Sequence, residues 1–561
     1  MLEEEVIKTL GFLGIEKIEE TLEVPPCSEL GDLASTVCFQ LAKKERKKPE
    51  EIAEEIVKKI KIPRKSLIKK VEAKSGYINF FFDWEKISEK VLKEIQKGIE
   101  LNEGKRKRIM VEYSQPNPVH PMHIGHARST FLGDALANML EFLDYKVIRA
   151  NYMNNVGLQV AKLVTAYLLW GNKKEPEEKP DLWLWEFYVK FHEEANKNPK
   201  LEEKAREILR KYEIERDKEV IKIWNKVVGW CVKGFEETYK KLGIKFNVYF
   251  YESDSRDLGK KLVEDALRKG IAFRSPEGAI VADLEKYGLP NIVILRSDGT
   301  GLYVTSDLGL TKQKFEKYKL EKAFWVVSSE QNLYFKQLFK ILELLGFSWV
   351  KNCYHFSFEL VRLPEGKMSS REGKAVMLDE VIKKLTELAL KEVEKRNPGM
   401  KEKEKVRIAE IIGIGALKYA IVKIDPSNAI IFDWNRMLSL QGDTGPYLQY
   451  ACTRCNGILK KAGKWKPSYK TKKLTQEEKD LIKLLLKFPK VVKDAAENLR
   501  PNYICNYAFD LATAFDKFYE YCPVLKAEKR LREFRLTLVD CTRKILKNCL
   551  KIIGIQIPEK M

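Results

Sequence analysis

The sequence predicts a multidomain α/β protein whose central part is built around a parallel sheet. A chain of 561 residues is too long for a single hydrophobic core, so three or four domains are expected. A strand, a loop, a helix and a second strand follow one another between residues 109 and 152. After residue 434 nearly every segment has the periodicity of an amphipathic helix.

The first hundred residues predict a small α/β unit. The run at 32–60 has apolar positions at three- and four-residue steps, which is typical of a helix. The segment YINFFF at 77–82 indicates a strand, and the basic stretch NEGKRKR at 102–108 is typical of a linker. We therefore expect an N-terminal domain over residues 1–104.

The central part begins with IMVEYS at 109–114, a predicted buried strand. A loop, a helix and the strand KVIRANY follow, and this order builds parallel sheets that bind ligands at the carboxyl ends of their strands. From about 170 to 290 the pattern becomes helical and charged, and strand patterns return at 291–297 and 323–329. These features predict a domain over 105–425 with a helical insertion at about 170–290.

The C-terminal part, residues 426–561, is expected to be all-helical and strongly basic. Residues 451–561 hold 25 Lys and Arg against 12 Asp and Glu, so one fifth of the chain carries over half of the net charge of +21. Such an excess favours a polyanionic partner such as nucleic acid. A lysine-rich composition that serves solubility is the alternative.

Bulk composition excludes several classes of protein. No apolar run is long enough to cross a bilayer, and the acidic start MLEEEVIKTL lacks the basic region of a signal peptide. The 10 cysteines are scattered, which favours a reducing cytoplasm. Cys452 and Cys455 have CxxC spacing, but no second pair lies nearby, so an ordinary helix is the preferred interpretation and no structural zinc is expected.

Three of the 5 histidines lie in one short stretch, VHPMHIGHAR at 119–128. A loop between a strand and a helix offers backbone N–H groups and the positive end of a helix dipole to a phosphate. Gly125 allows a nucleotide to approach the backbone, while His123 and His126 can donate hydrogen bonds to phosphate oxygens. A polar loop that merely caps a helix remains the alternative for these residues alone.

A second basic loop follows much later, Lys367-Met368-Ser369-Ser370 within PEGKMSSREGKAV. A lysine on such a loop can stabilise the α-phosphorus of a triphosphate during attack by a carboxylate. HIGH followed by KMSS resembles the class I aminoacyl-tRNA synthetases, which have a Rossmann-type catalytic domain. The resemblance implies catalytic roles for His123, His126, Lys367 and Ser369. It also implies ATP contacts from His120, His123, Gly125, His126, Lys367, Met368, Ser369 and Ser370.

Flanking stretches resemble the arginyl-tRNA synthetases over essentially the whole length. They are VEYSQPNPVHPMHIGHARST, GTGLYVTSDLGL, WVVSSEQNLYFKQLF, GDTGPYLQYACTR and the terminal PEKM. A guanidinium has donors and no acceptor, so its pocket requires carboxylates and other acceptors. The resemblance assigns the arginine contacts to Glu112, Asn117, His123, Tyr303, Asp307 and Gln331. A capping Glu, a turn Asn and a surface ion pair are the corresponding structural alternatives.

Four positions depart from the family pattern. His120 stands where many relatives have lysine, Asn155 where an aspartate is common, and Tyr334 where a histidine is frequent. Ser370 also replaces the second lysine of the KMSKS motif. These changes leave open which group supplies the positive charge of the missing lysines at the phosphate site. His120 could donate to the triphosphate, or it could only shape the loop.

The resemblance also implies two RNA-binding surfaces. The C-terminal domain resembles a helical anticodon-binding domain, with Tyr447, Tyr450 and Arg454 on one helix face and Met561 added. Aromatic side chains backed by arginine suit splayed bases, although a half-buried Tyr stripe between helices would look the same. The N-terminal domain resembles the domain that contacts the tRNA D-loop, through Lys74, Tyr77 and Asn79. Strand alternation alone would also account for Tyr77.

The implied reaction joins arginine and ATP into arginyl-adenylate and then passes the arginyl group to the terminal ribose of arginine tRNA. Mg²⁺ would accompany ATP, and we expect a cytoplasmic monomer that needs bound tRNA before it activates arginine. The rivals are a cysteinyl-type synthetase, which would need a zinc-ligand set, a small-molecule nucleotidyltransferase, and a non-catalytic tRNA-binding relative. A nucleotidyltransferase leaves the basic C-terminal part unexplained, and intact HIGH and Lys367 disfavour a non-catalytic relative.

Overall fold

The structure is a computed structural model that describes residues 1–362, 376–431 and 442–561. The chain divides into two compact units. One comprises residues 1–99, 455–487 and 513–545, and the other residues 100–454, 488–512 and 546–561. The functional residues of the central domain all lie in the second unit, so that unit is the one that positions the site.

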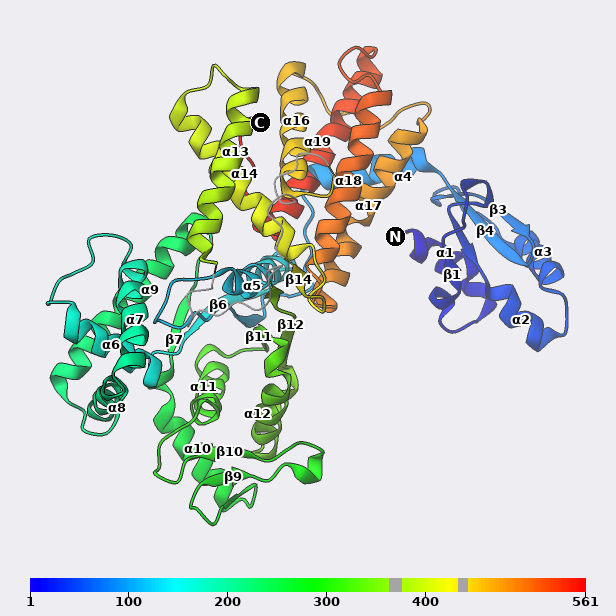
Figure 1. Cartoon of the computed structure of the whole chain (residues 1–561). Helices are drawn as coiled ribbons and strands as arrows, with labels where there is room; N and C mark the ends of the chain where they lie inside the picture. Colours follow the sequence, from blue (N-terminus) through cyan, green and yellow to red (C-terminus); the bar gives the residue numbers. More distant parts are fainter. Residues whose placement is uncertain (363–375, 432–441) are drawn as a thin grey trace. The chain divides into compact units, whose positions relative to one another are not determined.

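The N-terminal residues form a four-stranded antiparallel sheet with helices beside it (Figure 1). The strands are β1 (Leu22–Glu23), β2 (Leu33–Ser35), β3 (Ile68–Lys74) and β4 (Tyr77–Phe82), and the helices beside them are α1 (Leu2–Leu10), α2 (Val37–Glu45) and α3 (Pro49–Lys59). The next helix, α4 (Trp84–Lys97), extends away from this sheet (Figure 1). The predicted strand at 77–82 is confirmed. The prediction of one helix over 32–60 was wrong, because Arg46 takes a left-handed φ of 56° and Pro49 starts a new helix.

The central sheet has five parallel strands in the order β12-β11-β5-β6-β7. Their bounds are β5 (Arg108–Glu112), β6 (Lys146–Met153), β7 (Val248–Tyr251), β11 (Lys322–Ser328) and β12 (Cys353–Phe358). The chain runs outward from β5 to β7 and then returns to the other side of β5 with β11. The order of strands therefore reverses between β5 and β11, and in open α/β sheets ligands bind at the carboxyl ends of the strands at this point.

Helices cover both faces of this sheet, as a doubly wound fold requires. Figure 1 shows α5 (Ile124–Phe142) on one side and α11 (Tyr303–Tyr318) and α12 (Asn332–Leu344) on the other. The α11 and α12 side packs around Met110, Ala150 and Trp325 from the strands. α10 (Arg256–Arg268) joins it, and Gly259 and Gly309 let α10 and α11 touch through their backbones, where a Cβ on Gly309 would meet backbone at 2.6 Å.

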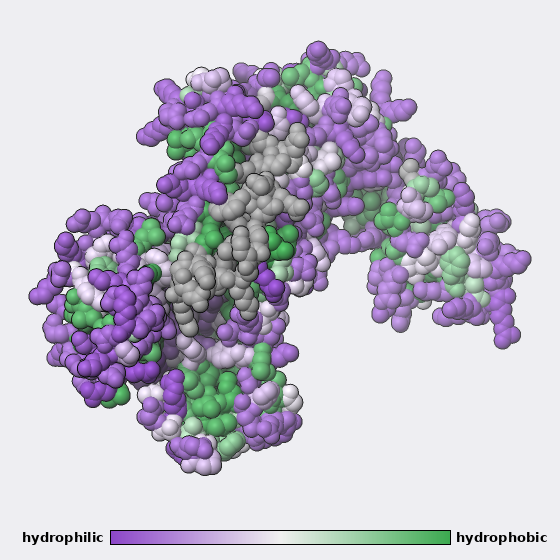
Figure 2. All heavy atoms as spheres, in the orientation of Figure 1, coloured by the Kyte–Doolittle hydropathy of each residue, from purple (hydrophilic) through white to green (hydrophobic). Residues whose placement is uncertain are grey.

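The helical insertion is shorter than the predicted 170–290. It consists of α6 (Leu158–Trp170), α7 (Pro180–Lys197), α8 (Lys200–Glu213) and α9 (Lys218–Leu242). Asp217 caps the start of α9 and Gly243, at a φ of 69°, ends it, after which β7 rejoins the parallel sheet. The predicted strand at 291–297 corresponds to β10 (Ile292–Leu295), which pairs with β9 (Ile280–Ala282) in a separate antiparallel sheet. The other side of β9 pairs with β8 (Ala272–Arg274). On the face in Figure 2 hydrophilic residues dominate the insertion.

Helices make up most of the rest of the chain, as predicted. They are α13 (Leu378–Arg396), α14 (Glu402–Val422), α16 (Gly445–Ala462), α17 (Gln476–Glu497), α18 (Asn502–Tyr521) and α19 (Lys529–Ile552). Two short strands, β13 (Val361–Arg362) and β14 (Ile430–Ile431), pair in parallel. None of the helices in the described ranges is long and apolar enough to span a membrane.

Candidate active site and RNA-binding residues

The histidine loop lies at the switch point of the sheet, between the end of β5 and the start of α5. Ser114 and Gln115, with φ values of 79° and 50°, turn the chain out of β5 although neither is glycine. Backbone held in this region by non-glycine residues is typical of functional loops. The loop ends at His123, which is the N-cap of α5.

His123 and His126 cap α5 reciprocally. The Gly125 N–H donates to His123 Nδ1 at 3.1 Å, and the His123 N–H donates to His126 Nδ1 at 3.1 Å. Because both Nδ1 atoms accept, each neutral ring carries its proton on Nε2. Burial lowers the pKa of His123 to about 3 and that of His126 well below its ordinary value. The loop therefore offers two neutral Nε2–H donors, and it caps the helix at the same time.

The segment that follows the KMSS loop pairs with the histidine loop through the backbone. His123 forms an antiparallel bridge with Met377, the Ile124 N–H donates to the Val376 carbonyl at 3.0 Å, and the Leu378 N–H donates to Met122 at 2.8 Å. Lys367, Met368, Ser369 and Ser370 themselves lie outside the described residues. The KMSS stretch thus ends, in sequence, a few residues before a fixed junction with HIGH.

Glu112, the last residue of β5, is buried in an ion pair that the sequence did not reveal. Lys314 Nζ lies 2.5 Å from Glu112 Oε2, with a side chain only 1% exposed. The same ammonium lies 5.1 Å from the ring centroids of both Phe250 and Trp325. Lys314 thus neutralises Glu112 in a buried environment next to two aromatic rings.

Asp307, on α11, is a second, part-buried carboxylate close to Glu112. The Tyr334 hydroxyl donates a hydrogen bond to Asp307 Oδ2. Burial raises the pKa of Asp307 to about 7, the Tyr334 hydrogen bond and Lys314 lower it, and Glu112 and Glu252 raise it further. Lys314 pairs with Glu112 and Arg256 pairs with Glu252. Among the described residues, Asp307 is therefore the carboxylate of this group that lacks an ion-pair partner and could bind a cationic ligand.

The other predicted arginine contacts have more exposed side chains. Asn117 is exposed in the histidine loop, and Gln331 is exposed just after β11, before α12. Tyr303 is 60% exposed at the first position of α11, and Asn154 Nδ2 lies 3.3 Å from its hydroxyl. The predicted helical relation of Tyr303 to Asp307 is confirmed by α11, and Asp307 is the less exposed of the two.

Three family models match successive parts of this chain. Residues 86–434 match the family model for the catalytic domain of tRNA synthetases class I (R), residues 1–82 that for the arginyl tRNA synthetase N terminal domain, and residues 448–561 that for the DALR anticodon binding domain. An arginine--tRNA ligase of Halothermothrix orenii is 39% identical over 99% of this chain and 98% of its own length. The chain belongs to the arginyl-tRNA synthetase family.

Two further relatives agree with this placement. An arginine--tRNA ligase of Clostridium perfringens is 38% identical over 99% of both chains. The solved structure of Thermus thermophilus arginyl-tRNA synthetase superposes with a TM-score of 0.83, at 29% identity, and covers 100% of this chain and 99% of its own. The Rossmann-type fold with an N-terminal and a helical C-terminal domain is thereby confirmed.

His120, which departs from the arginyl-tRNA synthetase pattern, is buried beside the other two histidines. Its ring centroid lies 5.6 Å from those of His123 and His126, and the Trp185 ring meets it edge-on at 5.9 Å. Burial lowers the pKa of His120, although a 2.9 Å hydrogen bond between Nδ1 and the Pro121 carbonyl opposes the shift. Burial therefore favours the neutral form of His120, and a nearby polyanion would favour the charged form.

We predict that His120 gains its proton when ATP binds, because a polyanion next to an imidazole raises the imidazole pKa. kcat should then fall as pH rises above the shifted pKa. His120→Lys should carry activity to higher pH, because lysine keeps its charge there. The measurement is the pH profile of kcat for wild type, His120→Lys and His120→Gln. Three superimposable profiles would leave His120 a purely structural role in the loop.

The C-terminal residues predicted to contact tRNA are brought together at one end of α16. Arg454 lies over the Tyr450 ring at 4.6 Å and donates to the Tyr450 hydroxyl at 3.1 Å. Tyr450 and Met561 line a small cavity of about 30 Å³ with residues of α13 and α14. Tyr447 instead packs against Phe509 at 5.7 Å. Tyr450, Arg454 and Met561 form one cluster, and Tyr447 has a helix-packing contact.

The N-terminal residues predicted to contact tRNA share the β3–β4 hairpin but differ in exposure. Lys74 is exposed and pairs in register with Tyr77, whose ring packs edge-on against Phe39 at 5.1 Å. Asn79 is only 4% exposed. Of the three, Lys74 is therefore the side chain most open to a phosphate backbone.

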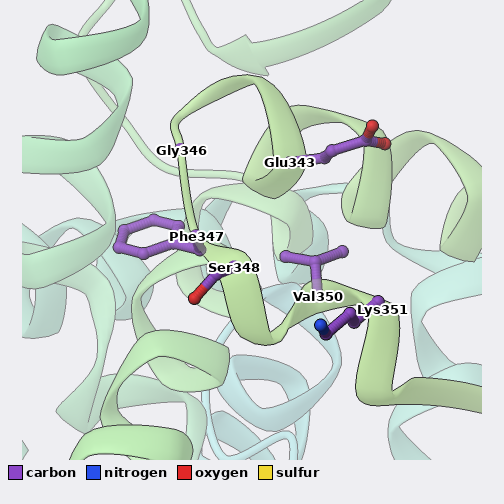
Figure 3. A pocket seen from close by; sticks show the side chains of 6 residues that line it. All are labelled: Glu343, Gly346, Phe347, Ser348, Val350 and Lys351. Carbon is purple, nitrogen blue, oxygen red and sulfur yellow. The ribbon is translucent and has the colours of Figure 1, made fainter.

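A larger surface hollow lies away from these residues. It has a volume of about 490 Å³ and is lined by Glu343, Gly346, Phe347, Ser348, Val350 and Lys351 (Figure 3). These residues precede β12, so the hollow lies at the amino ends of the parallel strands. Glu112 and Gln331 lie at the opposite, carboxyl ends, where ligands bind in such sheets. The hollow is thus not part of the candidate active site.

Proposed function

We propose that this chain is an arginine–tRNA ligase that activates arginine with ATP and transfers it to the 3′-terminal ribose of arginine tRNA. The observation that carries the proposal is the part-buried Asp307 carboxylate, which has no ion-pair partner among the described residues and lies close to the Glu112–Lys314 pair at the switch point. The full-length match to arginine--tRNA ligases supports it. A guanidinium requires such a pocket because it has donors and no acceptor.

In the proposed reaction, the arginine carboxylate attacks the α-phosphorus of ATP and pyrophosphate leaves. Asp307 binds the guanidinium, with Tyr303 and Gln331 beside it, while Glu112, Asn117 and His123 bind the remainder of the amino acid. His123 and His126 donate from Nε2 to phosphate oxygens as charge develops on them, and the backbone near Gly125 leaves room for the nucleotide. Positioning and electrostatics supply the catalysis, so no general base is invoked.

The remaining partners follow from this activity. Lys367, Met368, Ser369 and Ser370 would complete the ATP site together with His120. Mg²⁺ would arrive on the phosphates of ATP. Among the described residues no group of three or more His, Cys, Asp or Glu side chains is placed to hold a metal. We further propose that the protein acts as a monomer in the cytoplasm.

We propose a separate role for each domain: residues 1–104 contact the tRNA D-loop, residues 105–425 catalyse the reaction, and residues 426–561 bind the anticodon. Tyr450, Arg454 and Met561 would receive a splayed anticodon base, since a stacked Tyr–Arg pair beside an apolar cavity suits a single-stranded base. Tyr447 would support them. Lys74, Tyr77 and Asn79 would form the D-loop surface.

The test of the proposed function is tRNA charging with each of the twenty amino acids in turn. Arginine alone should be attached, and only to arginine tRNA. Charging with cysteine would establish the cysteinyl-type rival. Adenylate formation without any charging would favour a nucleotidyltransferase, and the absence of both would favour a non-catalytic RNA-binding protein.

We also predict that arginine activation requires bound tRNA. RNA bound near Tyr450 and Arg454 would act at a distance on the ATP site, which is a coupling between two sites. Pyrophosphate exchange with ATP and arginine should therefore be negligible until arginine tRNA is added, and a tRNA for another amino acid is the matched control. Exchange at full rate without tRNA would contradict this coupling.

A further inference from the structure

Tyr334 and Asp307 meet from two different helices on the same face of the central sheet. Asp307 lies in the second turn of α11, and Tyr334 lies in the first turn of α12. The Tyr334 hydroxyl donates to Asp307 Oδ2, and no described residue donates a hydrogen bond to the other oxygen, Oδ1. One side of the carboxylate is thus held by the protein, and the other has no protein partner within the described ranges.

The charged surroundings make this hydrogen bond more than a packing contact. The groups that act on Asp307 come from several elements, namely Glu112, Tyr152, Glu252, Lys314 and Tyr334. Burial raises the pKa of Asp307 to about 7, and the strongest effect that opposes burial is the Tyr334 hydrogen bond, ahead of Lys314. Without the hydroxyl, more of the carboxyl would be protonated and unable to attract a cation at neutral pH.

We propose that Tyr334 is a positioning residue for arginine, which holds Asp307 Oδ2 so that Oδ1 faces the substrate guanidinium as a charged acceptor. This role rests on the proposed function. A phenol suits it because burial keeps the pKa of Tyr334 well above its ordinary value. The hydroxyl therefore remains a neutral donor across the working pH range, whereas an imidazole would titrate within it.

The test is Tyr334→Phe, which removes one oxygen and keeps the ring. Arginine kinetics would be measured in the charging reaction at saturating ATP and tRNA, between about pH 6 and pH 9. The KM for arginine should rise about tenfold at pH 7, because a hydrogen bond to a charged group is lost. The acid limb of kcat/KM for arginine should move to higher pH, since the Asp307 pKa rises. The KM for ATP should not change.

Two further variants sharpen the test. Tyr354→Phe removes a hydroxyl from β12, where the ring stacks on Phe324 at 5.1 Å, and it should match wild type in both KM and pH profile. Tyr334→His keeps a ring donor and should restore much of the arginine affinity, and it carries the test if Tyr334→Phe melts at a markedly lower temperature.

An arginine KM and a pH profile in Tyr334→Phe that equal those of wild type would overturn the positioning role. An equal rise in the KM for ATP would also overturn it, because that pattern marks general damage. Failure of the wild-type protein to charge tRNA with arginine would instead remove the proposed function itself.

Discussion

Asp307→Asn should reduce kcat/KM for arginine by about 30-fold to several thousandfold, equivalent to about 2–5 kcal/mol, because the substrate cation loses its charged partner in a desolvated pocket. The substitution keeps the size of the side chain and an acceptor oxygen for the Tyr334 hydroxyl. The fold should therefore survive. Arginine kinetics at saturating ATP and tRNA measure the effect.

The pH dependence gives the same prediction a second readout. The pKa of Asp307 is raised to about 7, so the wild-type carboxylate is charged above that pH and arginine binding weakens as pH falls through it. Asp307→Asn cannot titrate and should lack this limb. Asp257→Asn, an exposed position in the first turn of α10, is the matched control. Unchanged arginine kinetics in Asp307→Asn would remove Asp307 from the pocket.

Lys314→Met should destabilise the protein by about 3–5 kcal/mol, because it leaves the Glu112 carboxylate buried without its counter-ion. Methionine has nearly the length of lysine, so the loss reports charge more than volume. The free energy of unfolding would be followed through the denaturant midpoint of the central domain. Lys317→Met, an exposed position one turn later on α11, should stay within about 0.5 kcal/mol of wild type.

A double variant isolates the buried charge. Adding Glu112→Gln to Lys314→Met removes the unpaired carboxylate and should recover much of the lost stability, although it should not recover arginine use. A midpoint for Lys314→Met equal to that of wild type would show that Glu112 does not depend on Lys314 as its counter-ion.

Much of the fold could be predicted because hydrophobic periodicity reports local burial. The strand at 77–82, the β5–α5–β6 unit and the helical C-terminal part all have clear periods. The left-handed conformation of Arg46 has no compositional signal, but Pro49 could have indicated that a new helix starts there. The partner of β10 was equally hidden, since a short apolar run has the same pattern in a parallel and in an antiparallel sheet.

Sequence reasoning singled out the two carboxylates of the candidate site but not the residues that contact them. Glu112 was predicted from the family resemblance and its place at the end of a strand, and Asp307 from the resemblance and its helical spacing from Tyr303; their contacts with arginine stay a prediction. Lys314 is seven residues after Asp307, about two helical turns along the same face, and that spacing could have been noticed. Its partner, however, is 202 positions away in the chain, and only the folded sheet places the two together. Tyr334 was noticed as a departure from the family, but its contact with Asp307 depends on how two helices pack.

The pairing of residues 122–124 with residues 376–378 has a consequence for the order in which the protein matures. More than 250 residues, including the whole helical insertion, must be synthesised between the two halves of this junction. Contacts of such long sequence separation form late, because the entropy of closing the intervening chain must be overcome first. A nascent chain can therefore assemble the N-terminal sheet and several strands of the central sheet while the histidine loop still lacks its pairing with residues 376–378. The capacity to use ATP should thus appear as one of the last steps of folding, only after residue 378 has left the ribosome.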